Sequence, residues 1–378
     1  MRILIDGRAF NIKGSSISVY LFNLLNEIFK LKNNEYILVL NNKNYIKEFD
    51  KFKNVQLIYS EIRNNLFWDN LIIPYFAIKT KSNVIFYPKG STSLFRVLGK
   101  KIVVTIHGMI YKIDTKVHSR IENIYWRFIG KLASLISNQI IAVSENDKQV
   151  LISEGYSAKK IEVIPIGISK IFFTSANQVV SKKILRDFNL EEKQYIIQVG
   201  HITKKKNQEF TINLFKEIFL NYPKLKLVFV GSKEVDKAYY GHLVELIKEY
   251  SLQNKIIFTN SIDQNKHKKI LPTLIQNSIL FVFPSTYEGF GMPVVEAIAS
   301  KVPVLSSNSG AIPEIIGVNN TLDINNKDLW ISMIKTLIDN KRFYKKIVSQ
   351  QSMTIKRYKW DKISNEYNKL FDKIWNEK

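Results

Sequence analysis

The chain contains no cysteine among its 378 residues. It therefore cannot form a disulfide framework, bind a metal through thiolates or use a cysteine nucleophile. Because disulfides persist in oxidising compartments, their exclusion fits a protein of a reducing compartment.

Long apolar segments are also missing. The longest apolar run, LIIPYFAI at 71–78, contains a proline, and it is far shorter than the roughly 20 residues that a membrane-spanning helix needs. The N-terminal stretch MRILIDGRAF reaches Asp6 after a short apolar run and lacks the apolar region of a secretory signal. We therefore predict no transmembrane helix and a cytoplasmic location.

Acidic residues are outnumbered by basic ones. The chain has 56 Lys and Arg against 33 Asp and Glu, a net charge of +23, which favours an anionic partner such as a phosphorylated substrate, an acidic membrane surface or a nucleic acid. The excess is spread over both halves of the chain and forms no basic arm. A solvated, lysine-rich surface explains this distribution as well as any single binding patch does.

The length exceeds what one core usually fills, so we expect two domains. Continuous Val, Ile, Leu and Phe runs are typical of strands buried on both faces of a parallel sheet, and here they alternate with helical periodicity. The runs fall into two series, at 2–6, 36–40, 83–87, 102–106, 139–144 and 161–165, and then at 195–200, 226–231, 255–259, 279–285 and 302–307.

This alternation predicts an α/β protein with two doubly wound, Rossmann-like domains that face each other across a cleft. We expect an N-terminal, acceptor-side domain at 1–172, a polar linker at 173–192 and a C-terminal, nucleotide-sugar-binding domain at 193–357. An amphipathic C-terminal helix at 358–378 can pack on either domain, including back on the N-terminal one.

One loop combines several signals for ligand binding. In PSTYEGFGMPVVEAIA, residues 284–299, Gly289 and Gly291 allow positive φ and close approach of a ligand to the backbone. Pro293 fits the first turn of a helix, where its missing N–H costs nothing. The helix N-terminus predicted here favours an anion such as a phosphate.

Two acids flank this predicted anion site. We place Glu288 on the loop and Glu296 in the first helical turn. Carboxylates repel a phosphate, so these acids would instead accept hydrogen bonds from neighbouring sugar hydroxyls. Alternatively, Glu296 only complements the helix dipole and Glu288 is a solvated loop residue.

A second loop carries cations. The strand YIIQV ends at Gly200, and Lys204, Lys205, Lys206 and Asn207 precede the next helical segment. Cations at the carboxyl end of a strand can neutralise a diphosphate leaving group. For Lys204 taken by itself, a solvated lysine turn is the better interpretation.

These residues resemble those of a known family. The pattern E-G-F-G-x-P-x-x-E from Glu288 to Glu296, the Lys206-Asn207 pair after Gly200 and the segment SNSGAIPEIIG at 307–317 look like the nucleotide-sugar half of retaining glycosyltransferases of family 4, which have the GT-B fold. In the first half, MRILIDGRAF, VVTIHGM, IIAVSENDKQVL and IEVIPIGI resemble that family's first domain.

The resemblance implies transfer of a sugar from a nucleotide diphosphate donor to an acceptor hydroxyl, with retained anomeric configuration. It assigns Glu296 to the ribose hydroxyls, Glu288 to the donor sugar and Lys206 to the diphosphate, with His107 reaching the donor sugar from the first domain. Glu288, Lys206 and His107 are the implied catalytic residues. The implied donor-binding residues are Gly200, Lys205, Lys206, Gly289, Phe290, Gly291, Met292 and Glu296.

The family works without a protein-bound metal or cofactor, and no D-x-D dipeptide occurs here. No covalent nucleophile stands out, so the resemblance implies front-face attack, in which the leaving phosphate accepts the proton of the acceptor.

The sequence departs from the family pattern at two places. His201 follows Gly200 where many relatives have arginine, and Lys205 is the candidate for the second cation. The glycine-rich turn of the first domain reads GSSISVY, so Ser16 and Ser18 occupy the expected glycine positions of an acceptor-side loop.

We therefore predict a glycosyltransferase that moves a hexose, with mannose the first guess, to a lipid-linked or growing glycan in surface polysaccharide (O-antigen or capsule) biosynthesis. The basic surface predicts peripheral contact with an anionic membrane, at the inner face of the plasma membrane. Two alternatives are a nucleotide-sugar epimerase of similar fold and a basic, non-catalytic nucleic-acid-binding protein. The second ranks last because the sequence has no recognisable nucleic-acid-binding module, so we expect no nucleic-acid partner.

Overall fold

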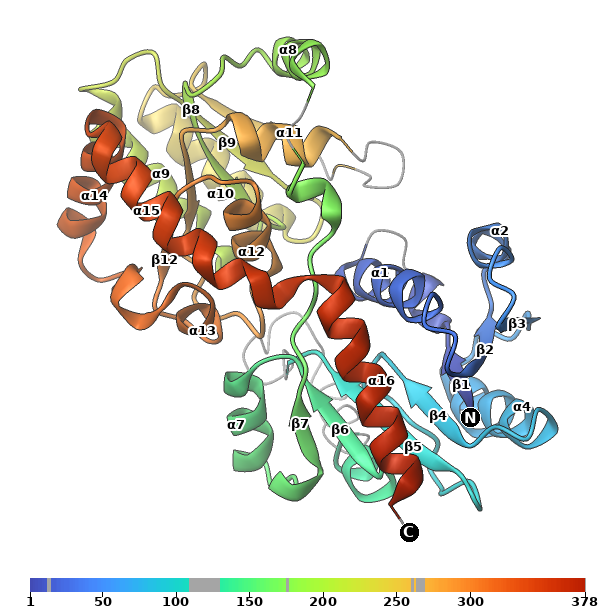
Figure 1. Ribbon diagram of the computed structural model, residues 1–378. Helices are drawn as coiled ribbons and strands as arrows, with labels where there is room; N and C mark the ends of the chain where they lie inside the picture. Colours follow the sequence, from blue (N-terminus) through green and yellow to red (C-terminus); the bar gives the residue numbers. More distant parts are fainter. Residues whose placement is uncertain (12–14, 109–129, 175–176, 260–261, 263–268, 378) are drawn as a thin grey trace. The chain divides into compact units, whose positions relative to one another are not determined.

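A computed structural model describes residues 1–11, 15–108, 130–174, 177–259, 262 and 269–377 (Figure 1). Gly14 and Met109, which belong to the motifs GSSISVY and VVTIHGM, lie outside the described residues. The chain divides into two compact units. Unit 1 comprises Met1–Gly167 and Tyr358–Lys378, and unit 2 comprises Ile168–Arg357.

Among the described residues, unit 1 has a seven-stranded parallel sheet in the order β3-β2-β1-β4-β5-β6-β7. The strands are β1 (Arg2–Asp6), β2 (Glu35–Leu40), β3 (Val55–Tyr59), β4 (Val84–Tyr87), β5 (Lys101–Ile106), β6 (Gln139–Ala142) and β7 (Ile161–Val163).

The buried strands of this sheet are those predicted from continuous apolar runs. Every residue of β4 and β6 is buried, as expected for strands covered on both faces. β3 was not predicted, because this edge strand is only partly buried and includes the polar residue Gln56.

Helices flank the sheet of unit 1. They are η1 (Arg8–Asn11), α1 (Ser16–Ile28), η2 (Lys43–Tyr45), α2 (Ile46–Phe49), α3 (Asn65–Phe67), the π-type turn η3 (Trp68–Ile72), α4 (Ile73–Lys79), α7 (Glu145–Ser153), η4 (Ala158–Lys160) and α16 (Trp360–Asn376).

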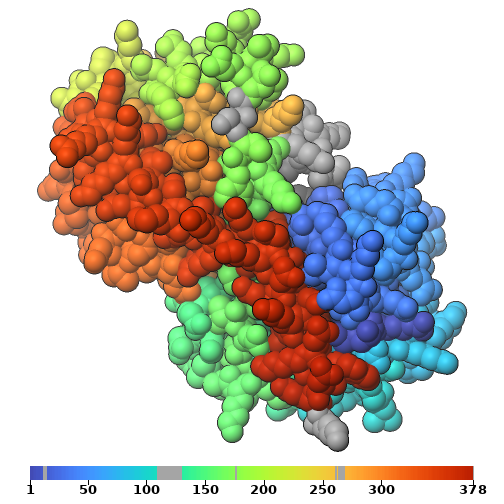
Figure 2. Space-filling model, viewed as in Figure 1, coloured from blue at the N-terminus to red at the C-terminus, as the bar shows by residue number. Residues whose placement is uncertain are grey.

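The C-terminal helix α16 is part of unit 1. It packs beside α1 in both views (Figures 1 and 2), and the buried hydroxyls of Tyr20 and Tyr367 lie 2.6 Å apart. The Lys101 ammonium donates to the carbonyl of Glu377 at 2.8 Å. Residues from the two ends of the chain therefore share one core.

Unit 2 has, within its described residues, a six-stranded parallel sheet in the order β10-β9-β8-β11-β12-β13. Its strands are β8 (Tyr195–Val199), β9 (Lys226–Val230), β10 (Ile256–Thr259), β11 (Leu280–Phe283), β12 (Val304–Ser307) and β13 (Thr321–Leu322). β13 was missed from the sequence because two residues give no periodicity.

The helices of unit 2 cover this sheet. They are η5 (Lys170–Phe172), α8 (Gln178–Asp187), η6 (Lys204–Lys206), α9 (Gln208–Phe219), α10 (Lys237–Glu249), α11 (Ile270–Asn277), α12 (Met292–Ala299), α13 (Ile312–Ile316), η7 (Val318–Asn320), α14 (Lys327–Asp339), α15 (Lys341–Thr354) and η8 (Ile355–Tyr358), which reaches the boundary of the unit.

The segment 173–192 is not a simple linker. It contains α8, which begins after the cap residue Asn177 and buries Ile184 and Leu185, and unit 2 already begins at Ile168. The polar sequence was misread because α8 is amphipathic and buries only one face.

The predicted fold class, two doubly wound α/β units, is confirmed. In each sheet the strand order reverses once, between β1 and β4 in unit 1 and between β8 and β11 in unit 2. Ligands of such sheets bind beyond the carboxyl ends of the strands at this reversal. The loops after these four strands are therefore where functional side chains are expected.

Candidate functional site

An ion pair lies at the strand reversal of unit 2. Lys206 follows β8 and Glu288 follows β11, and the Lys206 Nζ lies 2.5 Å from Oε1 of Glu288. The two side chains are only 15% and 9% exposed. The structure thus brings together two predicted catalytic residues that lie 82 positions apart in the sequence.

The backbone of Lys206 is held by the strand that precedes it. The buried amide of Gln198 in β8 donates to the carbonyl of Lys206 at 2.6 Å, and the Thr211 hydroxyl donates to the other end of that amide at 2.7 Å. A Cβ placed on Gly200 would lie 3.1 Å from the Lys206 side chain. A side chain at residue 200 would therefore crowd Lys206.

The loop of Glu288 is fixed on two sides. Its Thr286 amide donates to the carbonyl of Lys205 at 2.9 Å, which links it to the lysine loop. On the other side the Ala311 amide donates to the carbonyl of Glu288 at 2.9 Å, and the Ser309 hydroxyl donates to the Thr286 carbonyl at 3.0 Å. Three separate loops therefore position the ion pair.

Two glycines make these contacts sterically feasible. Gly310 has φ +57°, and a Cβ there would lie 2.1 Å from the carbonyl oxygen of Glu288. Gly291 has φ +88°, and a Cβ there would lie 2.4 Å from the side chain of Ile312. Only glycine combines these conformations with such close approach.

Helix α12 begins directly after this loop. Gly291 is its N-cap, Met292 its first residue and Pro293 lies in its first turn, as predicted. Phe290 is buried, whereas Gly289 and Met292 are partly exposed. The positive end of the helix dipole is thus next to the loop that carries Glu288.

The predicted position of Glu296 was wrong by one turn. It lies in the second turn of α12, so it does not complement the helix N-terminus from the first turn. Its side chain is buried, and burial raises its pKa from 4.5 to about 8. A carboxyl that is mainly protonated at neutral pH can both donate and accept a hydrogen bond.

The neighbouring cation positions differ in character. Burial first, and then the charge of Lys206, lower the pKa of His201, so this side chain does not replace the missing arginine with a second positive charge. The Lys205 Nζ lies 5.8 Å from the ring centroid of Tyr287. The assignment of Lys205 as the second cation of this loop stays a prediction.

His107 follows β5 in unit 1. Its Nε2 lies 2.9 Å from the carbonyl oxygen of Pro88, so Nε2 carries the proton in this bond and Nδ1 is left as an acceptor. Burial lowers the pKa of His107 to about 4, against the bond to Pro88, which raises it. The ring is therefore neutral near pH 7. It packs edge-on against Tyr20, with the two ring centroids 4.6 Å apart.

Ser16 and Ser18 do not form a loop, contrary to prediction. They are the first and third residues of helix α1, and Ser15 is its cap, whose hydroxyl accepts from the Ser18 amide at 3.2 Å. Ser18 is buried and Ser16 is exposed. The helix-capping signal of Ser15 was misread as part of a substituted glycine turn.

The sequence interpretation also missed a buried cluster at the strand reversal of unit 1. The Arg8 guanidinium bonds to Asp6 at 2.9 Å and, more closely, to Asp69, and it donates to the Ser91 hydroxyl at 3.1 Å. The Trp68 indole donates to Asp6 at 2.8 Å. The signal was present in Asp6-Gly-Arg8, an acid at the end of a buried strand with a cation two residues later.

Burial and charge act in opposite directions on the pKa values of this cluster. Burial lowers the pKa of Arg8, but the charges of Asp6 and Asp69 outweigh this effect and the net shift is upward. Burial raises the pKa of Asp69 to about 7, although the charge of Arg8 opposes the rise.

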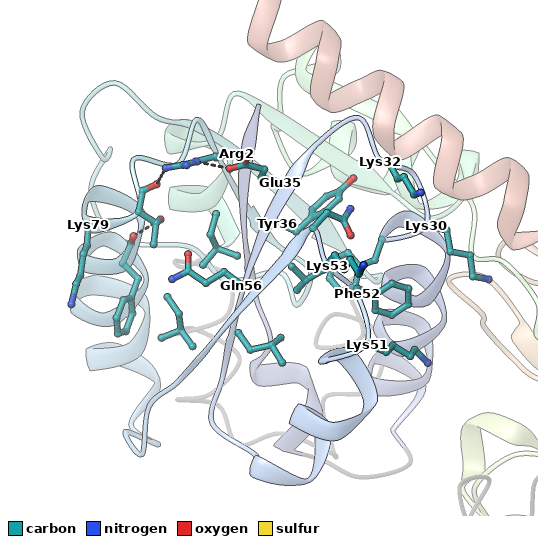
Figure 3. Close-up of a pocket in the computed structure, with 18 residues that line it drawn as sticks. Arg2, Lys30, Lys32, Glu35, Tyr36, Lys51, Phe52, Lys53, Gln56 and Lys79 are labelled. Carbon is teal, nitrogen blue, oxygen red and sulfur yellow. Dashed lines mark hydrogen bonds and ion pairs between the residues drawn. The ribbon is translucent and has the colours of Figure 1, made fainter.

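The described residues contain further features that bear on function. An open cavity of about 1360 Å³ in unit 1 lies along β2, β3 and α4, away from the loops discussed above (Figure 3).

In the described part of the chain, no helix is both long and apolar enough to cross a membrane. Within those residues there is also no group of three or more His, Asp or Glu side chains arranged to hold a metal.

Two family profiles match the chain. Residues 180–352 match "Glycosyl transferases group 1", and residues 72–170 match "Glycosyltransferase Family 4". The first covers most of unit 2 and the second a large part of unit 1.

Curated relatives carry related names. The chain is 28% identical over 63% of its length to the O-antigen chain mannosyltransferase RfbU of Salmonella typhimurium, covering 65% of that protein. It is 32% identical over 49% of its length to the capsular polysaccharide biosynthesis glycosyltransferase CapM of Staphylococcus aureus, covering 48% of it. The chain thus spans about half to two thirds of the length of these relatives.

Solved structures have the same fold. Anabaena HepE, crystallised with UDP-glucose, has a TM-score of 0.75 at 18% identity, with 99% of this chain and 100% of that chain covered. A glycosyltransferase from Rickettsia africae has a TM-score of 0.75 at 17% identity, with 100% and 99% covered. At these identities the likeness is evidence for the fold.

The two profiles match in the order of the two units, and the structural likeness extends over nearly the whole chain. This chain belongs to the glycosyltransferases of family 4 and has the GT-B fold.

Proposed function

We propose that this enzyme transfers a sugar from a nucleoside diphosphate donor to a hydroxyl of a glycan or lipid-linked acceptor, with retention of configuration. Support for the donor class comes from HepE, which was crystallised with UDP-glucose. Support for the acceptor class comes from relatives named for O-antigen and capsular polysaccharide synthesis. Mannose is the first sugar to test, because RfbU is named a mannosyltransferase.

The observation that carries the proposal is the Lys206–Glu288 pair at the strand reversal of unit 2. Without a ligand, each charge is the partner of the other in a site with little exposure to water. A diphosphate that approaches Lys206 would replace Glu288 as the partner of its ammonium group. Glu288 would then be able to accept hydrogen bonds from sugar hydroxyls.

In the proposed reaction the bond between the anomeric carbon and the phosphate oxygen breaks, and that oxygen keeps the electron pair. A bond from the acceptor oxygen to the same face of the anomeric carbon forms. The acceptor proton passes to the departing phosphate. Lys206, with Lys205 and the N-terminus of α12, would stabilise the negative charge on this phosphate. We assign the hydrogen bond to the donor sugar to Nδ1 of His107, as the family resemblance implies.

Glu296 is proposed to bind the ribose hydroxyls. Two donated hydrogen bonds favour the ionised carboxylate, whereas burial alone favours the protonated form. Donor binding near pH 7 should therefore release a proton from Glu296. Calorimetry of nucleotide binding in two buffers of different ionisation enthalpy would detect this release, and Glu296→Gln should abolish it.

The test of the function is a panel of nucleotide sugars with a glycan acceptor. We expect transfer from one donor, with an NMR coupling constant in the product that reports the same anomeric configuration as the donor. An inverted product would contradict retention. A donor that is isomerised without any acceptor would instead indicate an epimerase, and absence of both reactions with the whole panel would contradict the proposal.

The proposed chemistry assigns the diphosphate charge to lysines and includes no protein-bound metal. Activity should therefore survive EDTA. Loss of activity on chelation, restored by a divalent cation, would revise this part of the mechanism.

A further inference from the structure

Unit 1 carries an exposed apolar stripe on a continuous helical segment. In the segment formed by α3, η3 and α4, the outward side chains are Leu66, Phe67, Leu71, Tyr75 and Ile78, which are between 49% and 63% exposed. Their spacing of four, four and three residues from Phe67 onward follows one side of a helix. A surface helix normally has polar residues on this side.

The opposite side of the same segment is also apolar, because Trp68, Ile73 and Ala77 are buried in the core of unit 1. The segment is therefore apolar on both sides, and core packing accounts for only one of them. Two neighbouring residues, Leu94 and Phe95, extend the exposed surface and are 43% and 48% exposed. We call these seven side chains the apolar face.

The apolar face is a firmly held surface. Asn64 caps the segment by accepting from the amides of Leu66 and Phe67 at 2.9 and 3.2 Å. The side chain of Asn70 donates to the carbonyl of Leu66 at 2.8 Å and accepts from the amide of Leu94 at 2.7 Å. The helical segment and the loop with Leu94 are therefore joined directly.

The buried Arg8 cluster holds the same two elements from the inside. Arg8 bonds to Asp69 in the helical segment and to Ser91 in the loop, and it donates to the carbonyl and side chain of Asn65, both at 3.3 Å. Since Arg8 follows β1 at the strand reversal, the apolar face adjoins the carboxyl edge of the sheet of unit 1. In sheets of this kind ligands bind at that edge.

The stretch of sequence that carries the apolar face is basic. Residues 62–100 contain a single acid, Asp69, which is buried against Arg8. The basic residues of this stretch are Arg63, Lys79, Lys81, Lys89, Arg96 and Lys100.

One cation connects the apolar face to the cavity of unit 1. Lys79 has its Nζ 5.5 Å from the ring centroid of Tyr75 and also lines the cavity. Figure 3 shows Lys79 on one side of this cavity and Lys30, Lys51 and Lys53 on the other. The positive surface therefore continues past the end of α4.

We propose that the apolar face is a docking surface for the anionic lipid bilayer, with Phe67 and Leu71 in the interface and the flanking cations at the lipid phosphates. Apolar side chains on one helix face with lysine and arginine at its border match the requirements for a helix that lies in a membrane interface. The inference rests on the proposed function in one respect: docking through this face would bring the carboxyl edge of unit 1 to a lipid-linked acceptor.

A second copy of the chain fits this surface less well. A symmetric contact would place the basic border of one copy against the same border of the other, and like charges across an interface oppose association. An anionic bilayer complements both properties of the surface.

The experiment is vesicle flotation of the full chain with phosphatidylglycerol–phosphatidylcholine vesicles and with pure phosphatidylcholine. We expect binding to the anionic vesicles, weakened by salt and by the absence of phosphatidylglycerol. Phe67→Ser combined with Leu71→Ser should reduce the partition coefficient ~10-fold or more. Lys79→Glu combined with Lys81→Glu should reduce it by about fivefold for each cation lost.

Matched controls come from unit 2. Leu220→Ser combined with Val318→Ser removes two side chains that are also exposed, and Lys345→Glu combined with Lys346→Glu removes two exposed cations. Neither control should change flotation. All variants should keep the melting temperature and the nucleotide affinity of the wild type, which excludes misfolding as the cause.

Equal flotation of the face variants and the controls, or no flotation of the wild type at low salt, would overturn the proposal. So would a dimer in sedimentation that the Phe67→Ser and Leu71→Ser changes convert to a monomer. Flotation requires no turnover, so it can succeed where every donor in the transfer assay fails. The proposed function can likewise hold for a soluble acceptor when flotation fails.

Discussion

Both units place charged side chains where the strand order of a parallel sheet reverses, but the two sets differ in exposure and partners. In unit 1 the Arg8 guanidinium is sealed between Asp6 and Asp69, with 2% of its side chain exposed. In unit 2 Lys206 has one acidic partner, Glu288, and keeps some access to water. The same topological position thus holds a buried charge cluster in one unit and a partly accessible ion pair in the other.

The difference follows from the number of partners that each cation has. Arg8 bonds to two acids, a hydroxyl and a carbonyl that come from three separate chain segments, and a ligand could not replace them all without unfolding the loops. Lys206 bonds through its ammonium to one carboxylate, which the donor phosphate replaces in the proposed function. We therefore expect mutations to separate stability in unit 1 from activity in unit 2.

The largest expected effect is on the stability of unit 1. Arg8→Ala would leave Asp6 and Asp69 buried without their cation and should lower the free energy of unfolding by about 3–5 kcal/mol, measured by urea denaturation. Hydrogen exchange should increase in peptides of unit 1 more than in those of unit 2.

Arg2 is the matched control for Arg8, because its salt bridge to Glu35 is exposed. Arg2→Ala should cost less than about 1 kcal/mol. If both variants unfold at the same urea concentration, the cluster does not have the structural role assigned to it.

The next effect is on catalysis in unit 2. Lys206→Ala should reduce kcat by about 10²–10³-fold, because it removes the charge that stabilises the leaving phosphate. Its melting temperature should stay within a few degrees of the wild type. Lys204→Ala, two residues away in the same turn, should keep nearly full activity, and turnover of Lys206→Ala at the level of this control would refute the site.

A smaller effect concerns pH and Glu296. Because its pKa is raised to about 8 in the folded protein, the protonated carboxyl favours folding below about pH 4.5, and this contribution is lost as the pH rises through 8. Glu296→Gln should therefore match the wild type in melting temperature near pH 5 and exceed it above pH 8. Glu249→Gln, an exposed acid in the same unit, should show no such crossover.

The smallest effect concerns the C-terminal helix. Tyr20→Phe removes the 2.6 Å hydrogen bond to Tyr367 and should cost about 0.5–1.5 kcal/mol. Increased hydrogen exchange should appear in α16 and α1. If exchange instead increased in the helices of unit 2, the assignment of α16 to unit 1 would be wrong.

Much of the fold was predictable because most of the strands are buried. Continuous apolar runs located all strands except β3 and β13, and the reason lies in their environment: β3 is a partly exposed edge strand and β13 has two residues. Helix α8 was missed because its polar side dominates the sequence. The local sequence pattern thus fails to predict a helix or strand that buries little of its surface.

The candidate site was predictable in part. The loop-forming residues in the sequence predicted the positions of Gly291, Pro293 and the lysine turn, because backbone conformation depends on local residue type. The pairing of Lys206 with Glu288 was not predicted, since the two residues were assigned to different parts of the donor. Sequence gave no reason to expect the raised pKa of Glu296, because it arises from burial in α12.

The sequence by itself determined the parallel α/β class, the lysine and glutamate loops and the absence of thiol chemistry, because these depend on residue type and local spacing. Tertiary structure alone decided which charges are fully buried and which keep some access to water. It also decided that one side of the segment 65–79 is exposed, although its side chains are apolar. Burial depends on contacts between segments far apart in the chain, and local sequence carries little information about those contacts.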